Sequence, residues 1–445
     1  MKSNSWTTII LILLVALSLL LTIAIWNYQP SNDDLTNNED LIEAQLAGES
    51  QTKKETIQPS QIIYHVEGQP VGFEKKEDES ALYEEIQTWP IFDFAKTEID
   101  YQAINKEQNL TEIIFPTALP NEIVRDLFIV DEEVIPEGSF DRMYIRLSDK
   151  QGETQLIFLN VNTDTAIRAS VQNYSQVVRY LNNYRDNNTT SNHIVFKNSE
   201  DVNIYLPQKV NVSSYLSSYK EIEVNPFINL LFKTPSSVKS SFLKGGAIIY
   251  TDGTRELTRD TNHISFTDPT NATTVENQTI DDYQLLDQVH NNFMNTHLGF
   301  TATAPFRFIL TGLASTANTN VVDYSLSFNG RPVYQIDSLT KISVQWHDQK
   351  VHKYIHPNIQ LLDIRGPGQQ SNVLNPSSVV SILQGESYAN RSVHDVTIGY
   401  KLEQQSGRQL YKLTPTWYVK GIDDWEELDV PKQRIGGEHN AVEPN

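Results

Sequence analysis

Cysteine is absent from the 445-residue sequence. Disulfide bonds, thiolate metal sites and cysteine nucleophiles are therefore excluded together. Positive charge is scarce, because 35 lysines and arginines stand against 56 acidic residues and give a formal net charge of -21. A protein that binds nucleic acid by displacing counterions from phosphates needs the opposite sign. Nucleic acid is therefore not expected as a partner.

Motifs of the common cofactor and catalytic sites are also missing. The sequence contains no dinucleotide-binding glycine motif, Walker loop, His-Glu-x-x-His, Gly-x-Ser-x-Gly or EF-hand loop. It therefore nominates no catalytic residue, no metal ligand and no cofactor site.

Two weaker patterns leave an acyl-serine enzyme or a metal site open as alternatives. The Ser-x-x-Lys pattern needs a serine on a helix one turn from a lysine, but it is short and no Ser-Asp-Asn accompanies it. It occurs at Ser217/Lys220, Ser236/Lys239, Ser241/Lys244 and Ser338/Lys341. A histidine cluster is interpreted as exposed hairpin residues, because positions four apart on a strand lie about 13 Å apart, too far to share one zinc ion. The cluster comprises His347, His352 and His356, with His394 later in the chain.

One long apolar run is present, from Thr7 to Ile25. As a helix, roughly 19 residues at about 1.5 Å each reach about 28 Å, the thickness of a bilayer hydrocarbon core. A cleaved signal peptide would have a shorter apolar region followed by a small-x-small site, whereas this run exits as IAIWNYQP. We predict a transmembrane helix over residues 7–26. Aromatic residues typical of the two membrane interfaces flank it: Trp6, Trp26 and Tyr28.

The charges around this helix predict its orientation. Lys2 and the α-amino group precede it, while several acidic side chains follow it before the next cation, Lys53. We expect the N-terminus in the cytoplasm and the bulk outside the cell membrane. Small hydroxyl residues on one helix face allow another helix to approach and hydrogen-bond; alternatively, these hydroxyls bond a carbonyl one turn earlier and face lipid. The predicted partner face consists of Leu11, Val15, Ser18, Thr22 and Ile25.

The rest of the chain is divided by its polar runs. Residues 1–6 are a cytoplasmic start, and the polar, acid-biased residues 27–60 are predicted to form a tether. Polar runs at 185–192 and 267–279 indicate two boundaries. The predicted folded parts are an N-terminal α+β domain (61–192), a middle domain (193–278) and a C-terminal domain of helices on antiparallel sheet (279–432), followed by a tail (433–445).

Helix and strand signals alternate along the outer chain. Ser170 is predicted to open one helix. A second is predicted to begin at a Thr279 cap and end at Gly299, and a third lies between an Asn375 cap and Gly385. Strand pairs follow the second and third helices. We therefore predict an α+β fold, with packed helices on antiparallel sheet behind a single N-terminal transmembrane helix.

Three stretches of the sequence resemble one known family. The exit of the apolar run carries Thr22, Trp26, Tyr28 and Pro30, and the later stretches read DVTIGYKL (395–402) and LTPTWYVK (413–420). With the short cytoplasmic start, single span and outer part of this length, they resemble the YycH family of Gram-positive bacteria. The later domains of that family are similar to YycI.

The resemblance implies a regulator without catalytic activity. Family members associate with YycI and with the membrane histidine kinase WalK (YycG), which controls cell-wall metabolism with its response regulator. They modulate the kinase through the transmembrane helix and outer domains, and the sign of the effect stays open. A sensor of an unknown cell-wall ligand is the alternative, for which a closed apolar pocket is the expected sign.

Overall fold

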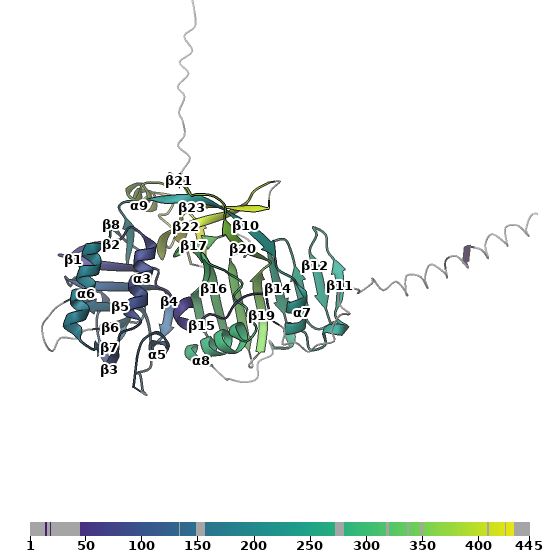
Figure 1. Cartoon of the computed structure of the whole chain (residues 1–445), viewed down its shortest axis with the longest axis horizontal. Coiled ribbons are helices and arrows are strands. Elements are labelled where there is room, and N and C mark those ends of the chain that lie inside the picture. Colours follow the sequence, from purple (N-terminus) through teal and green to yellow (C-terminus); the bar gives the residue numbers. More distant parts are fainter. Residues whose placement is uncertain are drawn as a thin grey trace, which may run out of the picture.

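Two sheets built mostly of antiparallel strands organise the chain, the N-terminal one in purple to teal and the C-terminal one in teal to yellow (Figure 1). The computed structural model describes residues 14, 15, 18, 45–132, 134–147, 156–271, 280–316, 320–335, 338–347, 350–406, 409–422 and 424–430.

The N-terminal sheet has nine strands, all paired antiparallel. Along the sheet their order is β3 (Ile91–Glu98), β7 (Thr165–Val171), β6 (Leu156–Asn160), β5 (Ser139–Arg146), β4 (Leu110–Pro120), β1 (Gln61–Val66), β2 (Gln69–Phe73), β8 (Thr190–Lys197) and β9 (Asn203–Pro207).

Helices cover both faces of this sheet. Successive side chains of a strand point to opposite faces, and in β6 the residues Leu156 and Phe158 belong to one apolar cluster while Ile157 and Leu159 belong to another. The first cluster includes side chains of α3 (Lys76–Ile86) and α6 (Tyr174–Asn187), and the second includes those of α4 (Tyr101–Ile104). Short helices η1 (Asn121–Ile123) and α5 (Val124–Leu127) follow β4.

The C-terminal sheet has fifteen strands, and β17 and β22 are parallel to each other. Its order is β11 (Lys239–Phe242), β12 (Ile248–Thr251), β13 (Glu256–Arg259), β14 (His263–Thr267), β19 (Lys350–Pro357), β18 (Lys341–His347), β16 (Asn320–Phe328), β17 (Arg331–Tyr334), β22 (Asp395–Gln404), β23 (Leu410–Lys420), β10 (Val212–Glu221) and β20 (Ile359–Ile364). Three strands pair from the side: β15 (Phe306–Ser315) with β16, β21 (Gln369–Ser371) with β10, and β24 (Trp425–Glu427) with β23.

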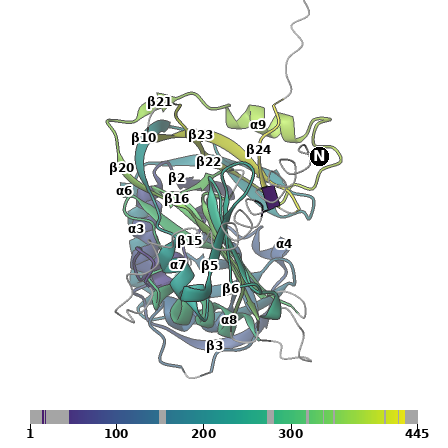
Figure 2. The same ribbon diagram turned by 90° about the vertical axis from the view of Figure 1, so that its right-hand side faces the viewer.

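The helices of the C-terminal half lie at different ends of this sheet. In Figure 2, α9 (Pro376–Leu383) lies beside β22, β23 and β24 at one end, and α8 (Asp282–Asp287) lies at the opposite end. A π-helix, η4 (Gln288–Asn295), continues α8 directly. The other helices described here are α7 (Asn225–Leu231), η2 (Pro235–Ser237) and η3 (Pro269–Asn271).

The predicted α+β class with antiparallel sheet is confirmed. The helix predicted after Asn375 is present as α9, and the Asn375 side chain accepts a hydrogen bond from the backbone N–H of Ser377 at 2.9 Å. The helix predicted from Ser170 begins four residues later, at Tyr174, because residues 165–171 pair with β3 and β6 as strand β7.

The predicted segment boundaries differ from the observed sheets. The boundary at 192/193 falls inside β8, which pairs with β2 and β9, so that residues 193–207 belong to the N-terminal sheet. Strands β10 to β14 of the predicted middle domain (193–278) belong to the C-terminal sheet. The described part of the predicted tether, residues 45–60, is packed into the body, with Leu46 only 1% exposed.

Among the described residues, no helix combines the length and the apolar character needed to cross a bilayer. Of the predicted span over 7–26, only residues 14, 15 and 18 are described, and they are helical. The rest of the span, the predicted cytoplasmic start (1–6) and the predicted tail (433–445) lie outside the described residues.

Candidate functional site

The two sheets contact each other along an extended interface. Strand β4 lies against β15, and β9 lies against β22. A third contact is made by the turn after β16, where a Cβ on Gly330 would stand 3.1 Å from the Cβ of Lys76 in α3. Gly330 has a φ of +73°, which glycine adopts without steric cost. Because one apolar cluster contains side chains of both sheets, the interface is continuous with the core.

Strand β9 connects the two sheets through its alternating side chains. Ile204 and Leu206 pack into a cluster with Val379 of α9 and Trp417 of β23 in the C-terminal half. Tyr205, on the other face of β9, is buried over β1 and β4. Since β9 lies at the edge of the N-terminal sheet, three strands away from β1, the sheet must curl to bring Tyr205 there.

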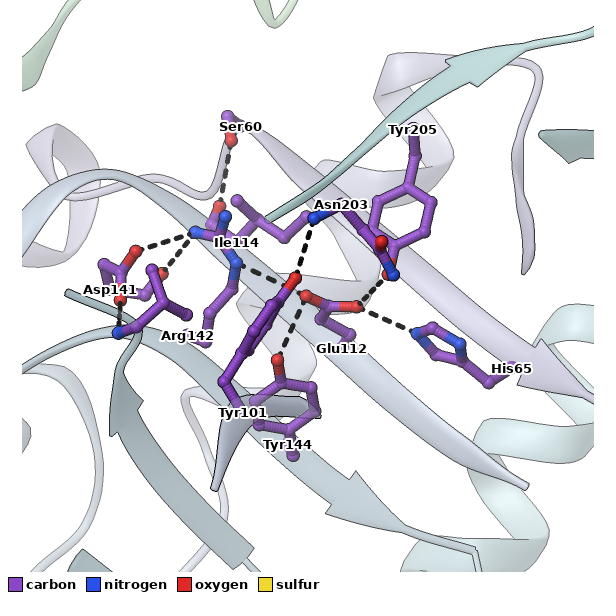
Figure 3. Close-up of polar contacts among 11 residues, drawn as sticks. Ser60, His65, Tyr101, Glu112, Ile114, Asp141, Arg142, Tyr144, Asn203 and Tyr205 are labelled. Atoms are coloured by element: carbon purple, nitrogen blue, oxygen red, sulfur yellow. Dashed lines mark hydrogen bonds and ion pairs between the residues drawn. The ribbon is translucent and has the colours of Figure 1, made fainter. Parts of the chain in front are cut away.

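A buried carboxylate fixes this curled arrangement (Figure 3). Glu112 of β4 is fully buried. Its Oε2 lies 2.8 Å from Nε2 of His65 in β1 and accepts the hydroxyl hydrogen of Tyr205 at 2.8 Å. Its Oε1 accepts from Tyr144 at 3.2 Å and lies 3.3 Å from Nε of Arg142, both in β5. One carboxylate therefore links three adjacent strands to β9.

The surroundings of Glu112 keep it ionised. Burial alone disfavours the charged form, but the contacts from His65, Arg142 and Tyr205 outweigh burial and hold the pKa of Glu112 below its ordinary value. Burial beside this carboxylate also raises the pKa of Tyr144 and Tyr205 well above 10. Both hydroxyls therefore remain protonated donors at neutral pH.

A cleft of about 450 Å³ opens beside this network, between the two sheets. The lining side chains include Thr117, Asp141 and Arg142 from β4 and β5, and Asp395, Thr397 and Lys420 from β22 and β23. Arg142 joins the cleft to the buried network, because its Nη1 donates to Asp141 Oδ2 at 3.0 Å while its Nε faces Glu112.

Charges from both halves meet across this cleft. Burial raises the pKa of Asp395, although the Val396 N–H, Arg142 and Lys420 act in the opposite direction. At one end of the cleft, Nδ1 of His394 lies 3.6 Å from the carboxylate of Glu200. The cleft is therefore lined by charged and polar groups of both halves together with apolar side chains such as Phe115 and Val396, and it is not the closed apolar pocket expected of a ligand sensor.

A second bridge between the halves is formed by the N-terminal arm, defined here as residues 45–57. Lys53 in α2 (Lys53–Thr56) is 7% exposed. Its ammonium donates to Asp126 of α5 at 2.8 Å and to Asp287 of α8 at 2.9 Å. Because these aspartates belong to the two halves, one lysine connects both, and its contacts with them keep its pKa raised against the effect of burial.

The start of the arm is bound to the C-terminal half. The Leu46 N–H donates to the His297 carbonyl at 2.7 Å, and the Glu49 N–H donates to the Phe300 carbonyl at 2.9 Å. Gly48 lies so close to this segment that an added Cβ would stand 2.4 Å from the Phe300 oxygen. Only glycine fits there without displacing the backbone.

His290 of η4 contacts the middle of the arm through a hydrogen bond. Its Nε2 lies 2.8 Å from the Gln51 carbonyl and its Nδ1 lies 3.1 Å from the Tyr324 hydroxyl. A neutral imidazole satisfies both contacts, donating to the carbonyl and accepting from the hydroxyl. Burial lowers the pKa of His290 to about 4, although the Gln51 carbonyl favours protonation.

The residues predicted from sequence lie elsewhere. Of the partner face, Val15 and Ser18 are described as helical and exposed. The other face residues and the predicted interface aromatics are outside the described residues: Leu11, Thr22, Ile25, Trp6, Trp26 and Tyr28.

The serine and histidine patterns do not converge. Ser217 and Lys220 occupy strand β10 instead of a helix, and the buried Ser217 hydroxyl donates to the Leu362 carbonyl at 3.2 Å. His356 is buried with its ring nitrogens against backbone carbonyls, whereas the rings of His347 and His352 lie 5.4 Å apart. Among the described residues, no three His, Asp or Glu side chains are placed to hold a metal ion.

Sequence reasoning missed the bridging residues. Glu112 had a usable signal, because it is an acidic residue within the apolar stretch LTEIIF. Lys53 had none, since both of its partners are distant in sequence.

These observations define a two-domain α+β protein whose halves share a polar cleft and a bridging arm. Family models agree: the YycH protein N-terminal domain matches residues 4–205, and the YycH protein C-terminal domain matches residues 201–434. The chain belongs to the YycH family, and the resemblance seen in its sequence is confirmed. The two matches meet at the start of β9.

Known relatives match this chain along most of its length. The Two-component system WalR/WalK regulatory protein YycH of Bacillus subtilis (strain 168) is 21% identical over 446 residues, covering 94% of this chain and 95% of that protein. The crystal structure of YycH from Bacillus subtilis matches with a TM-score of 0.66 and 16% identity, covering 86% of this chain and 99% of that one. At this identity the structural match establishes the fold.

Proposed function

We propose that the protein is a membrane-anchored, extracytoplasmic regulator of a two-component system of the WalR/WalK kind, acting on the sensor histidine kinase WalK (YycG) by binding and without catalysis. The observation that carries this proposal is the match to both YycH domains over residues 4–434. The regulatory role named for the Bacillus subtilis relative supports it. The apolar run over 7–26 supports the anchoring.

The arm gives a physical path from the proposed membrane helix to the body. Residues 45–57 follow that helix in sequence and contact both halves through Lys53. We infer that a rearrangement of the helix against the kinase is coupled to the interface between the halves. Binding shifts the kinase only by its difference in affinity for the two signalling states, about 1–3 kcal/mol in ordinary allosteric coupling. A YycI-like protein is proposed as a second partner.

The test of this function is a substitution series in the membrane helix. Ser18→Phe and Thr22→Phe place bulk on the proposed partner face, and Leu13→Phe and Leu20→Phe are matched controls on the opposite face. We expect the first pair to change expression of a WalR-dependent reporter, in either direction, and the second pair to leave it unchanged. Equal output from all four variants at equal membrane content would refute the proposed contact.

Topology is testable because the chain has no cysteine. Single cysteines at the exposed Glu200 and at Ser3 are treated in intact cells with a membrane-impermeant maleimide. Glu200→Cys is expected to react and Ser3→Cys to react only after lysis. The reverse pattern would place the body in the cytoplasm and contradict the proposal.

A sensor of a cell-wall ligand is the second candidate function: the cleft between the halves is not the closed apolar pocket expected from the sequence, but its charged and polar groups suit a polar wall fragment. Thermal stabilisation of the protein by wall fragments, abolished by Asp395→Asn, is the expected sign. No stabilisation over a panel of such fragments would dismiss it.

A further inference from the structure

The hairpin of β11 and β12 exposes two consecutive large apolar side chains. It lies at the end of the C-terminal sheet farthest from the N-terminal sheet (Figure 1). Phe242 is 83% exposed and the next residue, Leu243, is 46% exposed. Exposing adjacent apolar side chains to water is unfavourable, so a pair of this kind indicates a contact surface.

The turn of the hairpin holds this pair in place. The Leu243 N–H donates to the Ala247 carbonyl at 2.8 Å, and the Gly246 N–H donates to the Leu243 carbonyl at 3.3 Å. Gly245 and Gly246 have φ of +97° and +89°, which permits the tight reversal. A Cβ on either glycine would meet nothing within 4 Å, so the turn projects clear of the body.

The segment that carries the hairpin has a charge opposite in sign to that of the whole chain. Residues 224–251 contain three lysines and no acidic residue, although the chain has a net charge of -21. Lys239 and Lys244 are exposed and flank the apolar pair. The hairpin therefore combines an apolar tip with two exposed lysines.

We propose that this tip, residues 239–248, docks on an anionic lipid bilayer, with Phe242 and Leu243 among the upper acyl chains and the two lysines at the headgroups. An apolar insertion flanked by cations matches that interface in both polarity and charge. A second copy of this chain is a poorer partner for the tip, because it would place the same lysines against each other and they would repel. The inference rests on the proposed membrane anchoring, and it adds a second point at which the body meets the membrane.

The chain length permits this contact. Residues 27–44 join the proposed membrane helix to the arm, and at about 3.3 Å per residue 18 residues span at most roughly 60 Å. The body can therefore lie against the bilayer in which its own helix is anchored.

The test uses a single fluorescent label on the full-length chain. Ser241→Cys is labelled with nitrobenzoxadiazole, and the protein is reconstituted in vesicles of phosphatidylglycerol and phosphatidylcholine or of phosphatidylcholine alone. A nitroxide lipid spin-labelled near the headgroup serves as quencher. We expect strong quenching in the anionic vesicles, and a fall of roughly tenfold in the docked fraction when Lys239→Glu and Lys244→Glu are combined.

Val134→Cys, labelled in the same way, is the matched control. Val134 is also exposed, at 78%, but follows the acidic run Asp131 to Glu133. It is expected to remain unquenched. Phe242→Ser with Leu243→Ser should abolish quenching of the label at 241 while leaving the melting temperature unchanged, since both side chains are exposed.

The outcomes separate this inference from the proposed function. Absence of quenching at 241 in protein that resists alkaline extraction from the vesicles would overturn the docking while leaving the anchor intact. Equal quenching in neutral vesicles, or a spectral shift that depends on protein concentration without lipid, would also overturn it. Release of the protein on alkaline extraction would instead contradict the anchoring.

Discussion

Glu112 is the residue on which the shape of the N-terminal half depends most. Its carboxylate accepts hydrogen bonds from two tyrosines and lies against His65 and Arg142. A buried charge is tolerated only when its partners replace the lost water. Here those partners come from the two strands beside β4 and from β9, so satisfying one charge also determines how far the sheet curls.

Glu112→Gln tests this role. The amide keeps the size of the side chain but loses the charge facing Arg142, and its NH₂ group cannot accept a hydrogen bond. We expect the free energy of unfolding to fall by about 3 kcal/mol, as when one member of a buried ion pair is removed. Chemical denaturation measures the change, with the exposed Glu98→Gln as the control, which is expected to stay within about 0.5 kcal/mol.

His290 predicts a pH dependence of stability. Its pKa of about 4 in the folded protein lies below the value of about 6.5 expected after unfolding. The unfolded chain therefore binds more protons between these values, and stability is lost as the pH falls from about 6.5 toward 4.

We expect His290 to account for roughly 2 kcal/mol of the loss between pH 7 and pH 5. Denaturant titrations at the two pH values should show a smaller loss in His290→Gln than in the unsubstituted protein. Identical losses in the two proteins would show that His290 is protonated equally in both states.

At the scale of elements, prediction succeeded where the signal was local. Asn375, Pro376 and Gly385 lie within a few residues of one another and define α9 by capping alone. The π-helix η4 and the order of the fifteen strands depend on contacts between distant segments, and no local pattern contains that information. The packed arm was missed for the same reason, because Lys53 meets partners 73 and 234 residues away.

Lys53→Met tests the arm as an element. The methionine fills similar space but leaves Asp126 and Asp287 facing each other without the cation. We expect a loss of about 2 kcal/mol, less than for a fully buried pair because both aspartates contact water. Limited proteolysis should also cut residues 45–57 faster. Lys54→Met, one position along α2, is the control. Equal cleavage rates in both variants would contradict the bridging role of Lys53.

For the whole molecule, one apolar cluster contains side chains of both halves, which favours cooperative unfolding. The α+β class and the family follow from the sequence, but the boundary between the halves does not. The sequence predicted a boundary at 192/193, whereas β8 and β9 are joined to the first sheet. Strand β9 also packs on the second half. The polar run at 185–192 marks no domain boundary, because it covers the end of α6 and the start of β8, which both belong to the first half.

We therefore expect the chain to unfold in a single transition. Scanning calorimetry should give equal calorimetric and van't Hoff enthalpies. Two separated heat-absorption peaks would contradict this expectation, because they would show that each half is stable without the other.

The route of the arm has a mechanical consequence. Its first backbone hydrogen bonds are made with His297 and Phe300. Lys53 then forms ion pairs with both halves before β1 begins. A pulling force applied from the N-terminal side would therefore act on the contact between the halves before it acted on the first strand. Under such a pull the contact between the halves would therefore open before β1 lost its hydrogen bonds to β2 and β4.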